Sequence, residues 1–310
     1  MGAFIIDTND LVKTFGRTIA LNKLKLQVPK GISGFIGKNG AGKTTTIGVL
    51  LGLLKPNWGE ATIFGLDCWR DSYEIRRRVG VMHEFNSYPG CFRGERFLQH
   101  VAKIYGILQF KQRATESLKD VGLSDVKDKP IKTYSAGMLR RLGLAQALIG
   151  DPELVILDEP TANIDPLGRI AILDKIKETH KKRGTSFLIS THILSDLEKV
   201  CSWLSIIDTG KIIEQGNVND LAEKYSANIY KIDISNPQLF AENIQALRAV
   251  EKVWIEMDIV YCKVKDPDII YEEIPKIATK LGLQLKGFQR MLGTLEEIYT
   301  KTAGGNKNGT

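Results

Sequence analysis

Glycine, lysine and threonine residues are concentrated in one short stretch, GKNGAGKT, at residues 37–44. The stretch fits the pattern G-x-x-x-x-G-K-[ST], follows an apolar run and opens a helix-like run. Glycines let successive backbone N–H groups close around phosphate oxygens, and the positive end of the following helix attracts the same anion. Lys43 can reach the β- and γ-phosphates, and the hydroxyl of Thr44 can bind Mg²⁺. The pattern predicts a phosphate-binding loop; a plain turn between strand and helix is the alternative.

Two adjacent carboxylates end another apolar run, LVILDE at residues 154–159. Ligands of α/β proteins bind at the carboxyl ends of parallel strands. Asp158 is therefore expected to hold Mg²⁺, and Glu159 to act on the attacking water. An acidic turn facing solvent is the alternative for the pair taken alone. His192 follows a third apolar run; a lone histidine is usually a surface or packing residue, but from a strand end its ring could reach a γ-phosphate.

Short apolar runs alternate with amphipathic helical patterns along residues 1–225. The strands are expected at residues 32–36, 79–82, 154–157, 187–189 and 204–207. The helices are expected at residues 44–54, 139–149, 170–183 and 194–201. This alternation predicts an α/β domain with a mainly parallel sheet.

The order of the elements changes after about residue 225. Strands are expected at residues 228–234, 252–257, 259–265 and 284–288, with a hairpin turn near Asp258. Helices are expected at residues 237–247, 269–281 and 295–300. The order βαββαβ predicts a small ferredoxin-like α+β domain over residues 226–302. The Gly/Asn-rich residues 303–310 are predicted to be a disordered tail.

The composition limits the class of protein. The length of 310 residues suggests two domains, and 43% hydrophobic with 25% charged residues is ordinary for a soluble globular chain. The longest apolar run, residues 47–54, is too short to span a bilayer, and the N-terminus has no signal-peptide pattern. The four cysteines form no CxxC pair, which argues against a metal site or a disulfide framework and favours a reducing compartment.

Four motifs occur in one order along the chain. They are the phosphate loop at residues 37–44, YSAGM at residues 134–138, LVILDEP at residues 154–160 and STH at residues 190–192. Together they resemble the ATP-binding subunits of ABC transporters, most closely those that serve drug and antibiotic exporters. The resemblance covers residues 4 to about 225. It implies a P-loop NTPase cassette with a mainly parallel core sheet, an antiparallel β part and a helical subdomain at about residues 85–150.

The resemblance also implies ATP and Mg²⁺ as cofactors. It implies the following ATP-binding residues: Phe15, Gly37, Lys38, Asn39, Gly40, Ala41, Gly42, Lys43, Thr44, Thr45, Glu84, Ser135, Gly137 and Asp165. The implied metal ligands are Thr44, Glu84 and Asp158. The implied catalytic residues are Glu159, as general base or water-orienting group, and His192, as the γ-phosphate switch. In the family, an aromatic residue at the position of Phe15 stacks on adenine.

The family's signature motif and D-loop act across a dimer. By resemblance, Ser135 and Gly137 contact the γ-phosphate held by a second subunit, and Asp165 lies at the same interface. The chain departs from the family where Glu84 stands in place of the usual glutamine, and where SAGM replaces SGGQ in the signature. These changes are not expected to inactivate the site, because Lys43 and the other chemical groups named above are present.

The function implied is ATP hydrolysis that powers transport, with export suggested by the subgroup. The expected partners are membrane-spanning permease subunits and either a second copy of the chain or a paralogous cassette, with no nucleic acid. The expected location is the cytoplasm, on the inner face of the cell membrane. A non-transport ABC ATPase acting on nucleic acid or ribosomes is one alternative, and a nucleotide-gated binding module with little turnover is another.

The net charge of +7 is concentrated in one part of the chain. Residues 70–141 hold 15 Lys+Arg against 8 Asp+Glu, whereas residues 226–310 hold 11 of each. In the family this stretch includes the helical subdomain, which meets the membrane partner. A solvated basic face is one interpretation. The other is a docking surface near anionic lipid headgroups, in which Arg93 and Arg96 take part.

Overall fold

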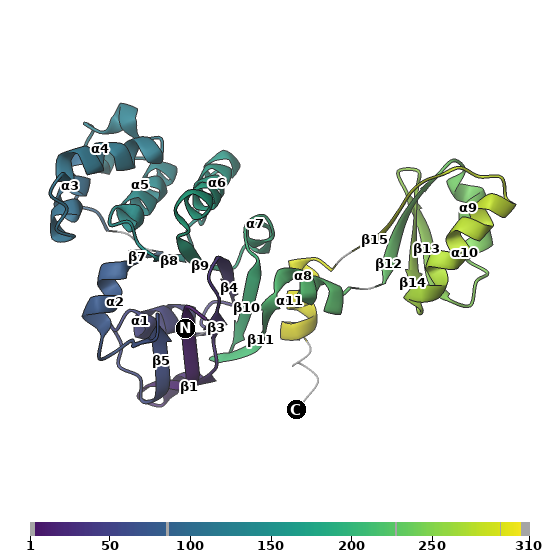
Figure 1. Cartoon of the computed structure of the whole chain (residues 1–310), viewed down its shortest axis with the longest axis horizontal. Helices are drawn as coiled ribbons and strands as arrows, with labels where there is room; N and C mark the ends of the chain where they lie inside the picture. Colours follow the sequence, from purple (N-terminus) through teal and green to yellow (C-terminus); the bar gives the residue numbers. More distant parts are fainter. Residues whose placement is uncertain (1–3, 85–86, 227, 292, 305–310) are drawn as a thin grey trace. The chain divides into compact units, whose positions relative to one another are not determined.

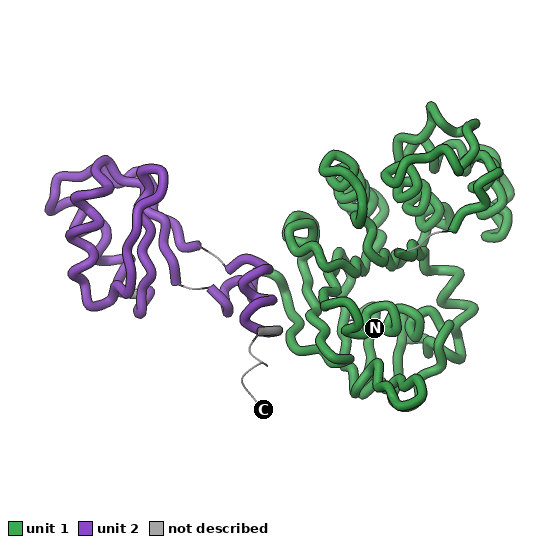
Figure 2. The backbone as a smooth tube through the Cα atoms, turned by 180° about the vertical axis from the view of Figure 1, so that it is seen from behind, with its two compact units in different colours: residues 1–218 green, residues 219–310 purple. Residues whose placement is uncertain are grey.

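The computed structural model describes residues 4–84, 87–226, 228–291 and 293–304. The chain divides into two compact units, Met1–Val218 and Asn219–Thr310 (Figure 2). This division lies seven residues before the boundary expected after residue 225.

A six-stranded sheet forms the centre of unit 1, in the order β11-β10-β4-β9-β8-β7. Its strands are β4 (Ile32–Ile36), β7 (Val79–Met82), β8 (Leu154–Asp158), β9 (Ser186–Thr191), β10 (Trp203–Asp208) and β11 (Lys211–Asn217). The first five of these run parallel, and β11 joins β10 antiparallel. Every residue of β4, β8 and β9 is buried, as expected for parallel strands covered on both faces. The prediction of a mainly parallel sheet is confirmed.

A second, antiparallel sheet of unit 1 has the order β2-β1-β5-β6, with β3 paired to β1. Its strands are β1 (Ile6–Phe15), β2 (Thr18–Leu24), β3 (Gln27–Val28), β5 (Trp58–Ile63) and β6 (Leu66–Asp67). Leu11 and Leu21 from this sheet share one hydrophobic core with Ile47 and Leu50 of helix α1 (Lys43–Leu50). The phosphate loop before α1 is therefore fixed between the two sheets.

Three helices of unit 1 form a subdomain with its own core (Figure 1). They are α3 (Gly94–Ile104), α4 (Phe110–Asp120) and α5 (Ala136–Leu148). Leu98, Leu118 and Leu142, one from each helix, are fully buried in that core. The other helices of unit 1 are α2 (Ser72–Arg78), α6 (Pro166–Arg183) and α7 (Leu194–Glu198).

Unit 2 contains a four-stranded antiparallel sheet in the order β13-β14-β12-β15. Its elements are β12 (Ile229–Ile234), α9 (Pro237–Ile244), β13 (Val250–Glu256), β14 (Ile259–Val264), α10 (Pro267–Lys280) and β15 (Leu285–Met291). The element order and the strand order are those of the predicted split βαβ arrangement. Met257 and Asp258 both have positive φ, the conformation of a type I′ hairpin turn, at the position expected for the turn.

Two further helices flank this sheet in the chain. Helix α8 (Val218–Lys224) crosses the division between the units by one residue, and α11 (Leu295–Gly304) ends the described chain. The predicted tail is therefore helical at residues 303–304, and the rest of it, residues 305–310, lies outside the described residues.

Candidate active site

A cavity of about 320 Å³ lies where helix α1 begins beside the carboxyl ends of β8 and β9. It is lined by Ala20, Asn39, Gly40, Gly42, Lys43, Thr44, Thr45, Glu84, Asp158, Glu159 and His192. All of these except Ala20 belong to the set predicted from the sequence. Segments more than 100 residues apart in the chain thus meet at one sheet edge, where an α/β fold binds its ligands.

The glycines of the loop are required by its backbone path. Gly40 and Gly42 have φ of +80° and +111°, in the region that residues with a side chain rarely adopt. A Cβ on Gly42 would also stand 2.8 Å from the carbonyl oxygen of Ala20, and one on Gly37 would stand 2.6 Å from that of Ile207. The loop therefore packs tightly against the strands behind it and has no room for side chains at Gly37 and Gly42.

Lys43 lies along the loop and is only 8% exposed. Its Nζ donates to the carbonyl oxygens of Gly37 and Lys38, at 2.7 and 3.3 Å. The ammonium group is thus held over the loop, at the positive end of α1. A phosphate that entered the loop would meet both the ammonium and the first N–H groups of the helix.

Asp158 and Thr44 lie opposite each other across the cavity. The hydroxyl of Thr44 donates to Oδ2 of Asp158 at 3.4 Å, and Asp158 is 3% exposed. Burial raises the pKa of Asp158 above its ordinary value, while the charge of Lys43 acts in the opposite direction. Hydroxyl and carboxylate oxygens are the ligands that Mg²⁺ prefers.

Glu159 is held in one orientation by the last residue of β9 and the residue that follows it. Its Oε2 accepts a hydrogen bond from the hydroxyl of Thr191 at 3.1 Å, and its Oε1 lies 2.9 Å from Nδ1 of His192. The side chain is 5% exposed, and the backbone is in the left-handed region with φ of +49°. A non-glycine residue in this conformation is strained and is typical of functional sites. The carboxylate is therefore fixed beside Asp158.

Thr191 was not identified from the sequence. It is 1% exposed, and its Oγ1 also accepts from the backbone N–H of Ile193 at 3.1 Å. The available signal was its position between a strand and His192 in the STH motif. Arg140 was missed as well: it donates to the carbonyl oxygens of Glu84 and His83, at 2.6 and 3.4 Å, and no local pattern predicts that contact.

Seven predicted ATP-binding residues do not line this cavity, and four of them lie outside the phosphate loop. Phe15 is 49% exposed at the end of β1, with Nζ of Lys13 5.2 Å from its ring centroid. Ser135 and Asp165 are the N-caps of α5 and α6. A Cβ on Gly137 would lie 3.8 Å from Oδ2 of Asp165. The last three residues are therefore brought to one another, and their predicted roles remain predictions.

Three other residues of the phosphate loop act through the backbone. The carbonyl oxygens of Gly37 and Lys38 accept from Lys43, as described above, and that of Ala41 accepts from the N–H of Gly210 at 2.9 Å. These contacts shape the loop from behind.

A phosphate loop before a helix, followed by an aspartate and a glutamate at the end of a buried strand, defines a P-loop nucleotide-binding protein. Comparison with known proteins identifies the family. A family model described as ABC transporter matches residues 21–162. The chain is 31% identical, over 96% of its own length and 92% of the relative's, to the daunorubicin/doxorubicin resistance ATP-binding protein DrrA of Streptomyces peucetius.

A second relative is the bacitracin transport ATP-binding protein BcrA of Bacillus licheniformis, which is 42% identical over 68% of this chain and 69% of its own. Among solved structures, an ATP-binding subunit of an ABC transporter superposes with a TM-score of 0.64 at 27% identity, covering 70% of this chain and 91% of that one. The chain belongs to the ABC transporter family and is an ATP-binding subunit. That prediction is confirmed, and the alternative of an ATPase acting on nucleic acid or ribosomes is set aside.

Within the described part of the chain, no helix combines the length and apolar character needed to cross a membrane.

Proposed function

We propose that this chain hydrolyses Mg-ATP to power export through separate membrane-spanning subunits, and that it does so as a dimer closed around two nucleotides. The observation that carries the proposal is the position of Glu159. Its carboxylate is buried, held by Thr191 and His192, and placed beside the loop that carries Lys43. A buried carboxylate in a strained and doubly held conformation is typical of functional sites, which supports a catalytic task for Glu159.

The residues present suit a magnesium ion carried by the nucleotide. Within the described residues, no cluster of three or more histidine, cysteine or acidic side chains could hold a metal by itself. Mg²⁺ usually takes one or two protein ligands, with phosphate oxygens and waters filling the rest of its shell. Thr44 and Asp158, with Glu84 on the same cavity wall, would hold the ion. When bound, it would neutralise the charge that develops on the phosphates.

Hydrolysis requires a water in line with the γ-phosphate and an acceptor for its proton. In the proposed step a Glu159 oxygen accepts the proton as the water oxygen attacks phosphorus and the bond to the β-γ bridging oxygen breaks. Lys43 stabilises the charge on the phosphate oxygens, and Thr191 keeps the carboxylate in position. His192, whose side chain is 58% exposed, would extend to the γ-phosphate from its place beside Glu159.

The dimer follows from the residues that lie outside the cavity. Ser135, Gly137 and Asp165 gather near the N-termini of α5 and α6 and are not among the residues that line the cavity. We infer that they complete the cavity of a second copy or of a paralogous cassette. A two-fold axis then makes two equivalent sites from one pair of surfaces. ATP binds the closed state better than the open one, so binding and hydrolysis drive closing and opening.

Export is supported by the names of the relatives, which are resistance and transport ATP-binding proteins. A subunit with this role would work on the inner face of the cell membrane, attached to its permease. Unit 2 carries no part of the cavity, and it would regulate the cassettes, stabilise the dimer or bind a small ligand.

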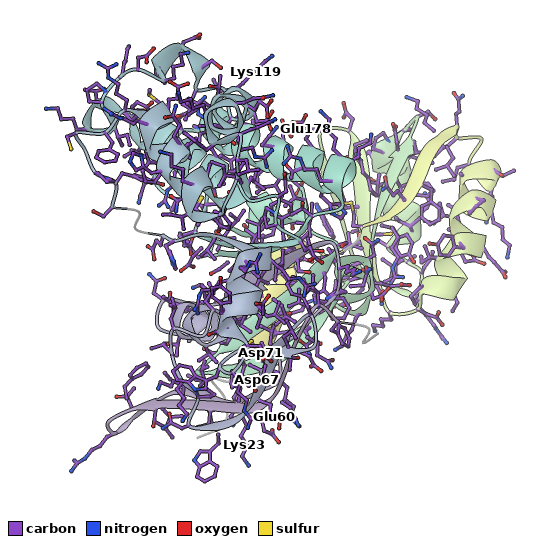
Figure 3. The ribbon with its side chains drawn as sticks, turned by 60° about the vertical axis from the view of Figure 1, so that its left-hand side comes forward. Lys23, Glu60, Asp67, Asp71, Lys119 and Glu178 are labelled. Atoms are coloured by element: carbon purple, nitrogen blue, oxygen red, sulfur yellow. The ribbon has the colours of Figure 1, made fainter. Side chains whose placement is uncertain are left out.

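The test is Glu159→Gln, which keeps the size of the side chain and removes its basicity. ATP hydrolysis should fall by at least about 100-fold, the usual contribution of a general base, while binding of a fluorescent ATP analogue persists. Glu178→Gln, on α6 (Figure 3), is the matched control and should retain full activity. Equal activity of the two variants would refute the role of Glu159. Negligible hydrolysis by the unaltered chain would favour a nucleotide-gated binding module instead.

The dimer and the permease have tests of their own. Light scattering should show that Glu159→Gln dimerises on addition of ATP, and that Ser135→Arg, at the proposed interface, does not. Purification from detergent-solubilised membranes should recover a membrane-spanning protein with the tagged chain. A chain that stays monomeric with ATP, or that recovers no membrane protein, would contradict the respective part of the proposal.

A further inference from the structure

The exposed face of helix α3 carries a row of basic side chains. We call this the α3 face, and it consists of Arg93, Arg96, His100 and Lys103. Successive members are three or four residues apart, so they lie on one side of the helix. All four are exposed, whereas Leu98 and Ala102 on the opposite side are fully buried in the core of the subdomain.

Two exposed aliphatic side chains lie at the C-terminal end of the α3 face, one on the last residue of the helix and one beyond it. Ile104 is 84% exposed and Leu108, in the turn before α4, is 94% exposed. Neither takes part in the core of the subdomain. Lys111 follows on the exposed side of α4, and Lys103 stands 4.4 Å over the ring of Phe110. A protruding aliphatic tip is thus bordered by cations.

The cations of this surface pair with no acidic side chain in the described part of the chain. Arg93, Arg96, Lys103 and Lys111 form no ion pair with any residue that the structure describes. The acidic residue of α3, Glu95, faces α4 instead, where it accepts a hydrogen bond from Thr115 at 2.8 Å. Over residues 87–141 the count is 11 Lys+Arg against 5 Asp+Glu, so the local field favours an anionic partner.

We propose that the α3 face, with Ile104 and Leu108, rests on an anionic lipid bilayer. A bilayer surface offers phosphate headgroups to the cations and, directly beneath them, hydrocarbon to the two aliphatic side chains. Lysines beside an inserted apolar tip keep their charge at headgroup level because their stems are flexible. Nucleic acid would match the charge but would offer nothing to a protruding leucine. The proposal deepens the proposed function, on which it rests, by naming a second partner beside the permease.

The test uses the purified full chain and vesicles without permease or ATP, so its outcome is independent of hydrolysis. The unaltered chain should sediment with phosphatidylcholine vesicles that contain phosphatidylglycerol, and not with phosphatidylcholine alone. Each basic residue near such a surface contributes about five-fold in partitioning, so Arg93→Gln with Arg96→Gln should weaken binding about thirtyfold. Leu108→Ser should weaken it about tenfold, and this loss should persist in high salt.

The control removes the same charge from another part of unit 1. Lys23→Gln with Lys211→Gln changes exposed lysines of β2 and β11. In Figure 3 the labelled Lys23 lies at the opposite end of unit 1 from Lys119, which belongs to the same helical subdomain as α3. This control should bind vesicles like the unaltered chain, and all variants should retain ATP hydrolysis.

Three results would overturn the proposal. The first is equal binding to vesicles with and without phosphatidylglycerol, and the second is an equal loss in the control and in the arginine variant. The third is an absence of vesicle binding together with a loss of permease recovery in the Arg93→Gln, Arg96→Gln variant. That result would assign the α3 face to the membrane protein rather than to the lipid.

Discussion

The hydroxyl of Thr191 offers a sharp test of how the site is positioned. It donates to Oε2 of Glu159 and accepts from the N–H of Ile193, both at 3.1 Å, and Thr191 is almost fully buried. Thr191→Val keeps the shape of the side chain and removes both hydrogen bonds. Thr191→Ser keeps both hydrogen bonds and removes one methyl group. The two variants therefore separate the effect of the hydroxyl from that of packing.

The expected magnitudes follow from the burial of the carboxylate. A hydrogen bond to a charged group contributes about 1.5–3 kcal/mol, and water cannot readily replace it at an oxygen of a residue that is 5% exposed. Thr191→Val should therefore lower the free energy of unfolding by about 2 kcal/mol, whereas the loss of one buried methyl group in Thr191→Ser should cost about 0.8 kcal/mol. Because Glu159 would no longer be held from both sides, kcat should fall about tenfold in Thr191→Val only.

The measurements are urea unfolding followed by tryptophan fluorescence, and ATP hydrolysis at a range of ATP concentrations. The positioning role predicts a fall in kcat with little change in KM, because Thr191 lies behind the carboxylate and outside the set of residues that line the cavity. If Thr191→Val matched Thr191→Ser in both kcat and stability, the hydrogen bond would have no positioning role. Glu159 would then not depend on Thr191 for its orientation.

Three further predictions concern other carboxylates of unit 1. Glu84→Gln should keep ATP hydrolysis within tenfold of the unaltered rate, and a larger loss would show that the charge itself is needed. Because burial raises the pKa of Asp158, its ionised form destabilises the fold at neutral pH. Without nucleotide, Asp158→Asn should therefore unfold at a higher urea concentration than the unaltered chain, and it should lose ATP hydrolysis. A lower unfolding midpoint would contradict this prediction. The hydrogen bonds from Arg78, at 2.6 and 3.0 Å, lower the pKa of Glu153. The ion pair therefore stabilises the fold at a pH above the ordinary pKa of a glutamate. This stabilisation is lost as the pH falls through the lowered pKa of Glu153. Because the pair is largely exposed, Glu153→Gln should lower the free energy of unfolding by about 1 kcal/mol or less at neutral pH, and should not change it in strong acid. A difference in unfolding free energy that does not depend on pH would exclude the ion pair as its cause.

The chemical groups of the site could be predicted because each lies at the end of an apolar run. Lys43 is part of a loop pattern, and Asp158, Glu159 and His192 end strands of one parallel sheet. Parallel strands bring their carboxyl ends to the same edge, so sequence positions far apart become neighbours without any knowledge of side-chain packing. The same reasoning gave the parallel sheet itself, because strands covered on both faces are continuously apolar.

The starts of α5 and α6 were predicted late, for a physical reason. Apolar periodicity first becomes visible at residues 139 and 170, whereas α5 and α6 begin at Ala136 and Pro166. The first turn of each helix is stabilised by its cap, in which Ser135 accepts from the N–H of Met138 and Asp165 accepts from that of Gly168. A search for periodicity does not detect a cap. Hydrogen bonds that the carboxylate of Asp165 accepts from backbone N–H groups, above all from that of Gly168, lower its pKa, in keeping with this capping role.

Contacts between distant segments were beyond prediction from a single sequence. Ala20 reaches the cavity from β2 because the backbone of the loop packs against it, and nothing in its own neighbourhood indicates a ligand site. Arg140 lies 56 residues after Glu84 and donates to its backbone carbonyl, which has no sequence signature at all. Such contacts depend on the exact path of two chain segments, and only coordinates supply that path.

Arg140 is also the physical connection between the cavity and the helical subdomain. Its guanidinium belongs to α5, the helix whose first turn Ser135 caps, and it holds the carbonyl oxygens at residues 83 and 84. The side chain of Glu84 lines the cavity. A displacement of this loop by nucleotide must therefore either carry α5 with it or break hydrogen bonds from a charged donor, which cost about 1.5–3 kcal/mol each. Arg140 therefore links the segment that carries Glu84 to the helical subdomain through hydrogen bonds from its guanidinium.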